Sequence, residues 1–157
     1  MKQTIVAASG YFDPIHSGHI DYLREAKKLA GKNGKLIVIV NNEKQVRLKK
    51  EHSFMPVKER KAILESVKYI DKVVISIDKD RSVSKTLKKI KPDIFAIGMD
   101  NYKDKIPERH ICNELGIKIV DRLARKFIIH PSLKQSSSKI IENYLKKKKC
   151  KCGRKLF

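Results

Sequence analysis

The chain has 157 residues, a hydrophobic fraction of 41% and a formal net charge of +20. This length suits one domain whose core needs no disulfides, and three cysteines without a secretion signal exclude a disulfide framework. No apolar run reaches about 18 residues, which excludes a membrane-spanning helix and makes the cytoplasm the expected location.

Short apolar runs alternate along the chain with stretches of helical periodicity. The runs predict β-strands over residues 4–8, 36–40, 73–75, 94–97 and 117–120, and the second is apolar throughout, as in strands covered on both faces. The periodic stretches predict helices over residues 17–30, 56–67, 82–90, 107–115 and 136–145, the first capped by Ser17 and Gly31. This alternation predicts an α/β fold with a doubly wound parallel sheet of about five strands and helices on both faces.

The last residues differ in composition from the rest. We place the domain at residues 1–145 and expect residues 146–157, half of which are lysine, to form a disordered basic tail. Cys150 and Cys152 could bind a metal, but zinc sites usually need four ligands and no second pair is present. The tail could also be attracted to an anionic membrane. A solvated lysine-rich surface is the simpler explanation of the charge, since no basic motif with interleaved aromatic residues predicts specific nucleic-acid binding.

The loops that leave the carboxyl ends of the strands are the expected place for chemistry, because doubly wound sheets bind ligands there. The first of them carries the strongest motif, which runs from Gly10 to His19 and reads GYFDPIHSGH. His16 and His19 are three residues apart at the start of the first predicted helix, so both rings can face one pocket. Free N–H groups at a helix start favour phosphate, and Gly18 lets a phosphate approach the backbone.

Two other interpretations of this motif are weaker. A metal site would need a third ligand near the two histidines, and the sequence marks none. The P-loop pattern and the dinucleotide-binding glycine pattern are both absent. A phosphate-binding pair of histidines is therefore the interpretation that we carry forward.

The motif resembles the HxGH signature of the cytidylyltransferase-like nucleotidyltransferase superfamily, which includes glycerol-3-phosphate cytidylyltransferases, heptose-phosphate adenylyltransferases and archaeal FAD synthetases. Four further stretches fit in order: Lys49-Lys50, the arginine of PVKER, GMDNY at 98–102 and QSSSKII at 135–141. The resemblance covers about residues 3–145 and implies a single Rossmann-like domain. It departs from the family where an arginine usually precedes the serine segment, and the candidates for that place are Arg122, Arg125 and Lys134.

The resemblance implies a role for each matched residue. The implied catalytic residues are His16, His19 and Lys49, and Arg60 and Lys50 would bind the acceptor. Arg60 has a second interpretation, in which it only ties its helix to a neighbouring carboxylate. The implied nucleotide-binding residues are Gly10, Tyr11, Phe12, Asp13, Gly18, Gly98, Asp100, Ser136, Ser137 and Ser138.

The implied reaction is transfer of CMP or AMP from a nucleoside triphosphate to a phosphorylated small molecule, with release of pyrophosphate. Mg²⁺ would accompany the nucleotide, no protein metal site is expected, and the resemblance implies a homodimer. CTP:alcohol-phosphate cytidylyl transfer is the first expectation. The alternatives are adenylyl transfer to a heptose phosphate or FMN, and a non-catalytic protein that binds nucleotides or nucleic acid on the same fold.

Overall fold

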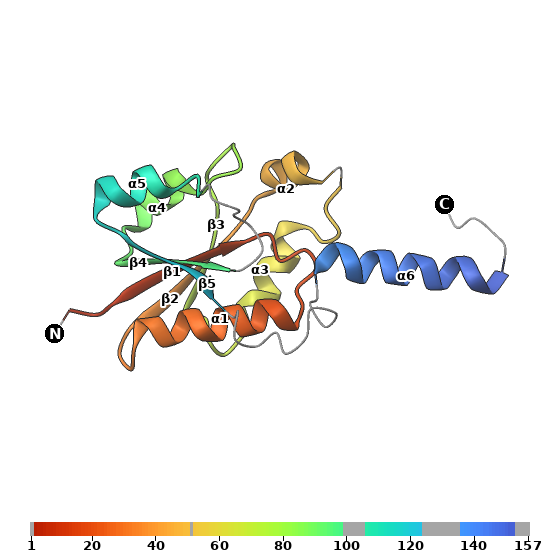
Figure 1. Cartoon of the computed structure of the whole chain (residues 1–157), viewed down its shortest axis with the longest axis horizontal. Helices are drawn as coiled ribbons and strands as arrows, with labels where there is room; N and C mark the ends of the chain where they lie inside the picture. Colours follow the sequence, from red (N-terminus) through yellow and green to blue (C-terminus); the bar gives the residue numbers. More distant parts are fainter. Residues whose placement is uncertain (1, 51, 99–105, 124–135, 153–157) are drawn as a thin grey trace.

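Five parallel strands form one sheet, in the order β3-β2-β1-β4-β5. They are β1 (Ile5–Gly10), β2 (Lys35–Val40), β3 (Lys72–Ile75), β4 (Ile94–Gly98) and β5 (Lys118–Leu123). These strands come from a computed structural model, which describes residues 2–50, 52–98, 106–123 and 136–152. All five predicted strands and the parallel, doubly wound sheet are confirmed (Figure 1).

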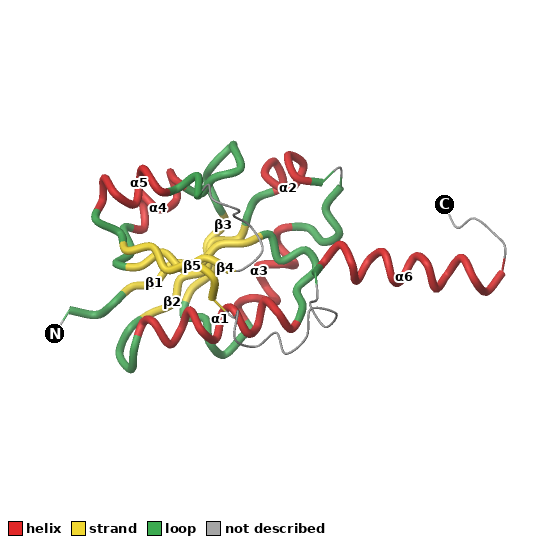
Figure 2. The backbone as a smooth tube through the Cα atoms, viewed as in Figure 1, coloured by secondary structure: helices red, strands yellow, loops and turns green. Residues whose placement is uncertain are grey.

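The helices pack in two layers on the two faces of this sheet (Figure 2). On one face lie α1 (Ser17–Ala30) and α3 (Val57–Glu65), and on the other lie α4 (Ser84–Ile90) and α5 (Arg109–Leu115). All four were predicted within a few residues of these bounds. Gly31 ends α1 with a φ of 72°, in the left-handed region that favours glycine.

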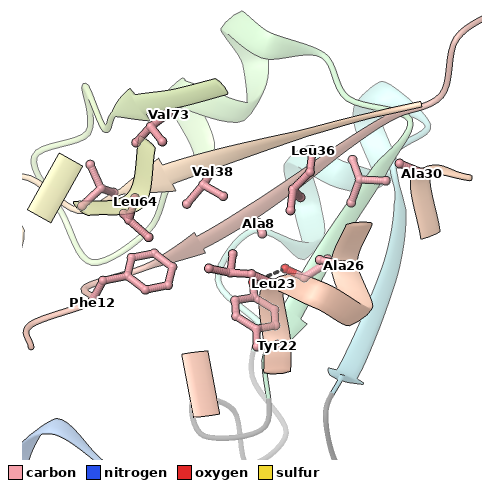
Figure 3. Close-up of a cluster of buried hydrophobic side chains, with 13 residues drawn as sticks. Ala8, Phe12, Tyr22, Leu23, Ala26, Ala30, Leu36, Val38, Leu64 and Val73 are labelled. Carbon is pink, nitrogen blue, oxygen red and sulfur yellow. Dashed lines mark hydrogen bonds between the residues drawn. The ribbon is translucent and has the colours of Figure 1, made fainter. Parts of the chain in front are cut away.

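Each layer buries its own apolar cluster against the sheet. Leu23 of α1 and Leu64 of α3 pack on Val38 in the first cluster (Figure 3), and Leu87 of α4 and Ile111 of α5 pack around Phe95 in the second. The Tyr22 hydroxyl donates to the Ala96 carbonyl at 2.8 Å, which satisfies the one polar atom that this ring carries into the core. Burial on both faces explains why the central strands are apolar throughout.

A short helix, α2 (Glu43–Lys49), stands where the sequence led us to expect a loop. Its first turn is closed by a reciprocal pair of bonds: Gln45 N donates to Asn42 Oδ1 and Asn42 N donates to Gln45 Oε1, both at 3.1 Å. This is a capping box, which satisfies backbone donors that a helix start otherwise leaves open. The box stabilises a helix too short to be seen from apolar periodicity.

The last helix, α6 (Ser137–Cys152), continues past residue 145, where the sequence places the domain boundary. The expectation of a disordered tail from residue 146 is therefore corrected for residues 146–152. Lysine is a good helix former, and Lys146 Nζ lies 2.5 Å from Glu142 Oε1, one turn earlier. Figure 1 shows α6 projecting away from the sheet. Among the described residues, no helix is long and apolar enough to cross a membrane.

Candidate active site

The carboxyl ends of β1 and β4 mark the point where the connections change face. The chain leaves β1 towards α1 on one face, and it leaves β4 towards α5 on the opposite face. A crevice outside neighbouring strands that diverge in this way is the usual ligand site of a doubly wound sheet. The predicted motif from Gly10 to His19 follows β1 and therefore borders this point.

The two predicted histidines stand together at the start of α1. Their ring centroids are 3.8 Å apart, with an angle of 30° between the planes. His16 is the N-cap residue, and its N–H donates to Nδ1 of His19 at 3.2 Å. We expected Ser17 to be the N-cap residue. The helix already begins at Ser17, so the N-cap residue is His16. The edge of the Phe12 ring lies against His19, with centroids 4.9 Å apart.

The surroundings of His19 keep its ring neutral. Burial, the largest cause, and the charges of His16, Lys50 and Lys49 together lower the pKa of His19 from 6.5 to about 3. Since Nδ1 accepts a backbone hydrogen bond, the proton of the neutral ring is on Nε2. His19 is thus a neutral N–H donor of fixed tautomer at physiological pH, suited to hydrogen-bond a phosphate oxygen.

Lys49 and Lys50, at the end of α2, lie close enough to His19 for both charges to affect its pKa. The two lysines differ in how they are held. Lys50 Nζ donates to the Asp13 carbonyl at 2.7 Å, whereas Lys49 is exposed, with its ammonium 4.5 Å from the centroid of the Tyr11 ring. The structure therefore brings His16, His19, Lys49, Lys50 and Tyr11 together, and Lys49 is the lysine better placed to meet a ligand.

Two residues of the motif shape the loop from inside the protein. Phe12 is 1% exposed, and a methyl group on Gly10 would lie 2.9 Å from its ring, so Gly10 is needed to seat the ring. Asp13 is equally buried and accepts hydrogen bonds from the N–H groups of Phe54 and Met55, at 2.9 and 2.7 Å. The side chains of Phe12 and Asp13 are therefore buried and anchor loops, and contact of these residues with a nucleotide stays a prediction.

Arg60 is also buried, and its guanidinium donates hydrogen bonds to other groups of the protein in the part of the chain that the structure describes. It donates to the carbonyl oxygens of Met55, Tyr11 and Asn41 at 3.0, 2.9 and 2.8 Å, and to Glu43 Oε1 at 3.3 Å. A guanidinium has five N–H donors, so these contacts leave little capacity for a ligand. The second interpretation, a tie to a carboxylate, describes part of this network, and binding of the acceptor by Arg60 stays a prediction.

The serine segment reaches the same loop through the start of α6. Ser136 Oγ accepts a hydrogen bond from Lys139 N at 3.2 Å and so caps the helix, while Ser137 Oγ donates to the Pro14 carbonyl at 2.7 Å. The N-terminus of α6 therefore lies beside the loop that carries the histidines, where its N–H groups favour phosphate. Ser138 is exposed in the first turn.

Two further predicted residues, both glycines, lie on elements that lead into the site. Gly18 lies in the first turn of α1, and Gly98 ends β4 beside the Tyr22 ring. Asp100, Arg125 and Lys134 lie outside the described residues, as do the side chains of Arg122, Cys150 and Cys152. The described residues contain no group of three histidine, cysteine or acidic side chains that could hold a metal ion.

Residues 76–83, between β3 and α4, form a wall of the site that the sequence analysis missed. Asn42 Nδ2 donates to the carbonyl oxygens of Ser76 and Asp78, and Gln45 Nε2 donates to those of Asp80 and Ser82, all at 2.7 to 2.9 Å. Asn42 and Gln45 are three residues apart, as in a capping box. This spacing is the sequence feature that could have marked the two residues. We call residues 76–83 the β3–α4 loop.

Glu108 holds the other end of this loop, and the pKa of its carboxyl group is shifted. Its Oε1 accepts a hydrogen bond from Val83 N at 3.0 Å, and its Oε2 is buried with no hydrogen-bond partner among the described residues. Burial raises the pKa of Glu108 above its ordinary value of 4.5, and the charges of Asp78 and Asp80 add to the effect. No pattern in the sequence distinguishes this glutamate from a surface one.

We expect Glu108→Gln to gain stability relative to the native chain as the pH rises. A raised carboxyl pKa in the folded state stabilises the fold at pH values below the unfolded pKa, and this contribution is lost as the pH rises through the folded pKa. Glutamine keeps an oxygen for Val83 N and does not ionise. Urea unfolding of both chains at pH 4 and pH 8 measures the effect, and a difference in unfolding free energy that is the same at both pH values would contradict it.

Comparisons with known proteins agree with this geometry. A family model described as Cytidylyltransferase-like matches residues 7–143. An FAD synthase of Archaeoglobus fulgidus is 35% identical over 147 residues, covering 89% of this chain and 96% of that protein. An FAD synthase of Methanopyrus kandleri is 34% identical over 122 residues, covering 78% and 80%. A solved lipopolysaccharide core biosynthesis protein from Thermoplasma volcanium superposes with a TM-score of 0.66 at 32% identity, covering 77% and 96%.

Proposed function

We propose that this chain, which belongs to the cytidylyltransferase-like family of nucleotidyltransferases, transfers AMP from ATP to FMN and releases pyrophosphate. The pair of stacked histidines beside the N-terminus of α6 is the observation that carries the transferase chemistry. The choice of substrates is supported by relatives named FAD synthase. They favour the adenylyl-transfer alternative over the CTP-dependent reaction that we first expected.

The chemistry of FAD fits this site. FAD is FMN joined to AMP through a phosphoanhydride, so the FMN phosphate must attack the α-phosphorus of ATP while pyrophosphate leaves. No covalent enzyme intermediate is required, and such phosphorus transfers depend mainly on positioning and on stabilisation of charge. A donor of fixed orientation such as His19 Nε2 can stabilise the charge that develops on the α-phosphate oxygens.

Each part of the site has a place in this proposal. His16 and His19 bind the α-phosphate, and Lys49 neutralises charge on the phosphates from the side of α2. Ser136, Ser137 and the first N–H groups of α6 receive the β- and γ-phosphates, because a helix N-terminus and serine hydroxyls both bind anions. Asp13, Lys50 and Arg60 hold the loops that carry these groups.

Mg²⁺ belongs to the proposal as an ion that arrives with ATP. It prefers phosphate oxygens and water to a cage of protein ligands. When bound, the ion would neutralise phosphate charge.

We expect the purified chain, given ATP, FMN and Mg²⁺, to form FAD and pyrophosphate in equal amounts. Chromatography measures FAD, and a coupled assay measures pyrophosphate. The same assay with CTP in place of ATP, and with glycerol 3-phosphate, phosphoethanolamine or a heptose phosphate in place of FMN, tests the other reactions. Transfer of CMP only, or orthophosphate as the first product, would reject the proposal.

A further inference from the structure

Three side chains from two helix starts hold the β3–α4 loop in place. Asn42 and Gln45 hold it from α2, and Glu108 holds it from the start of α5. Val83 and Glu108 are the N-cap residues of α4 and α5, so their hydrogen bond joins the starts of these two neighbouring helices. The loop thus borders the ligand edge of the sheet in a fixed position.

Arg81 is one of two exposed cations of this loop, and Lys79 is the other. Its guanidinium donates to the Leu48 carbonyl at the end of α2, and no carboxylate among the described residues lies within ion-pair distance. One hydrogen bond leaves a guanidinium with most of its donors available. Arg81 therefore differs from Arg60, whose N–H donors are almost all engaged in hydrogen bonds within the protein.

Tyr11 connects this arginine to the catalytic histidines. Burial raises the pKa of Tyr11, the charge of Arg81 lowers it and that of Glu108 raises it, so both charges lie near the ring. The Lys49 ammonium stands over the same ring. Arg81 binds the carbonyl of Leu48, the residue that precedes Lys49. Arg81, Lys49 and Tyr11 are therefore neighbours at the end of α2.

Two exposed apolar side chains belong to the segments that hold Arg81. Leu48, whose carbonyl Arg81 binds, is 45% exposed, and Ile77 of the β3–α4 loop is 52% exposed. A half-buried tyrosine, two exposed aliphatic residues and a guanidinium suit a flat ring system that has both an apolar edge and carbonyl oxygens. A simple polyol phosphate would leave the apolar groups without contacts.

We propose that Arg81 selects the acceptor by donating hydrogen bonds to the carbonyl oxygens of the flavin ring. This inference rests on the proposed function, in which the FMN phosphate lies at the histidines as the attacking group. The ring end of FMN then extends away from them, past Tyr11, towards the β3–α4 loop. Arginine suits this role because its planar fork can donate two parallel hydrogen bonds, which lysine cannot do.

The test compares Arg81→Gln with Lys79→Gln, which removes the same charge from an exposed residue of the same loop. We expect Arg81→Gln to raise the KM for FMN about tenfold, the loss that corresponds to about 1.4 kcal/mol of binding, and to leave the KM for ATP within about twofold. Lys79→Gln should change neither KM beyond about twofold. Arg81→Lys should recover only part of the affinity for FMN. Quenching of flavin fluorescence gives the dissociation constant of FMN directly.

Each outcome decides the matter. Equal effects of Arg81→Gln and Lys79→Gln would mean that only the net charge matters, and would overturn the inference. A rise in the KM for ATP alone would assign Arg81 to the nucleotide and overturn it too. If the native chain makes no FAD, the proposed function fails; if the native chain makes FAD and Arg81→Gln binds FMN normally, only this inference fails.

Discussion

Replacing His19 by alanine is expected to lower kcat for FAD formation by about 100- to 1,000-fold, the loss typical of removing one preorganised donor from a developing oxyanion. His19 Nε2 carries the proton of a ring whose orientation is set by His16 N and by the Phe12 edge. The KM for ATP should change much less, because the N-terminus of α6 and the lysines remain. Steady-state kinetics with saturating FMN measure both constants.

Two further variants separate chemistry from folding in this experiment. Asparagine at position 19 offers an oxygen to His16 N and an N–H group to the phosphate, so His19→Asn should lose less activity than His19→Ala. His110→Ala, at an exposed histidine of α5, should retain full activity. Circular dichroism checks that each variant is folded. A folded His19→Ala chain that turns over at the native rate would remove the histidine pair from the mechanism.

The histidine pair could be predicted because its geometry is local. A helix start brings residues three apart onto one face whatever surrounds it, and glycine and serine at the same helix start are typical of phosphate sites. The strands could be predicted for a similar reason, since continuous apolar runs in an alternating pattern suit a sheet buried on both faces. The order of the motifs along the chain then placed the α6 serines near the same loop.

The roles of Asp13 and Arg60 could not be predicted, because they depend on partners far along the chain. Asp13 accepts from residues 54 and 55, and Arg60 donates to residues 11 and 41. A charged residue near a phosphate motif looks like a ligand-binding residue until its partners are known. Burial decides between the two roles, and burial depends on how the loops fold over one another.

The position of the β3–α4 loop also depends on contacts between distant parts of the chain. Arg81 follows a weak, four-residue strand and has no neighbour in sequence that marks a site. Its position depends on side chains of α2 and α5, which meet the loop only in the folded chain. The proposed acceptor side of the site could therefore not be predicted from the sequence, whereas the phosphate side could.

Arg60→Ala is expected to lower the free energy of unfolding by about 3 kcal/mol or more, the cost typical of breaking a buried charged network by removing one partner. The substitution leaves the carbonyl oxygens of Tyr11, Asn41 and Met55 without their donor, and it opens a cavity beneath the loops. Urea unfolding monitored by circular dichroism measures the loss. Lysine cannot reach several acceptors at once, so Arg60→Lys should recover little of the stability.

The same variants decide whether Arg60 is structural or binds the acceptor. A structural role predicts a large loss of stability, with kcat and both KM values falling or rising together as the loops loosen. A binding role predicts a selective rise in the KM for FMN with unchanged unfolding. Glu43→Gln provides the matched control: Glu43 is 39% exposed on its side chain, so removing its charge should cost less than about 1 kcal/mol. If Glu43→Gln cost as much as Arg60→Ala, the ion pair, and not the three backbone carbonyls, would hold the loops together.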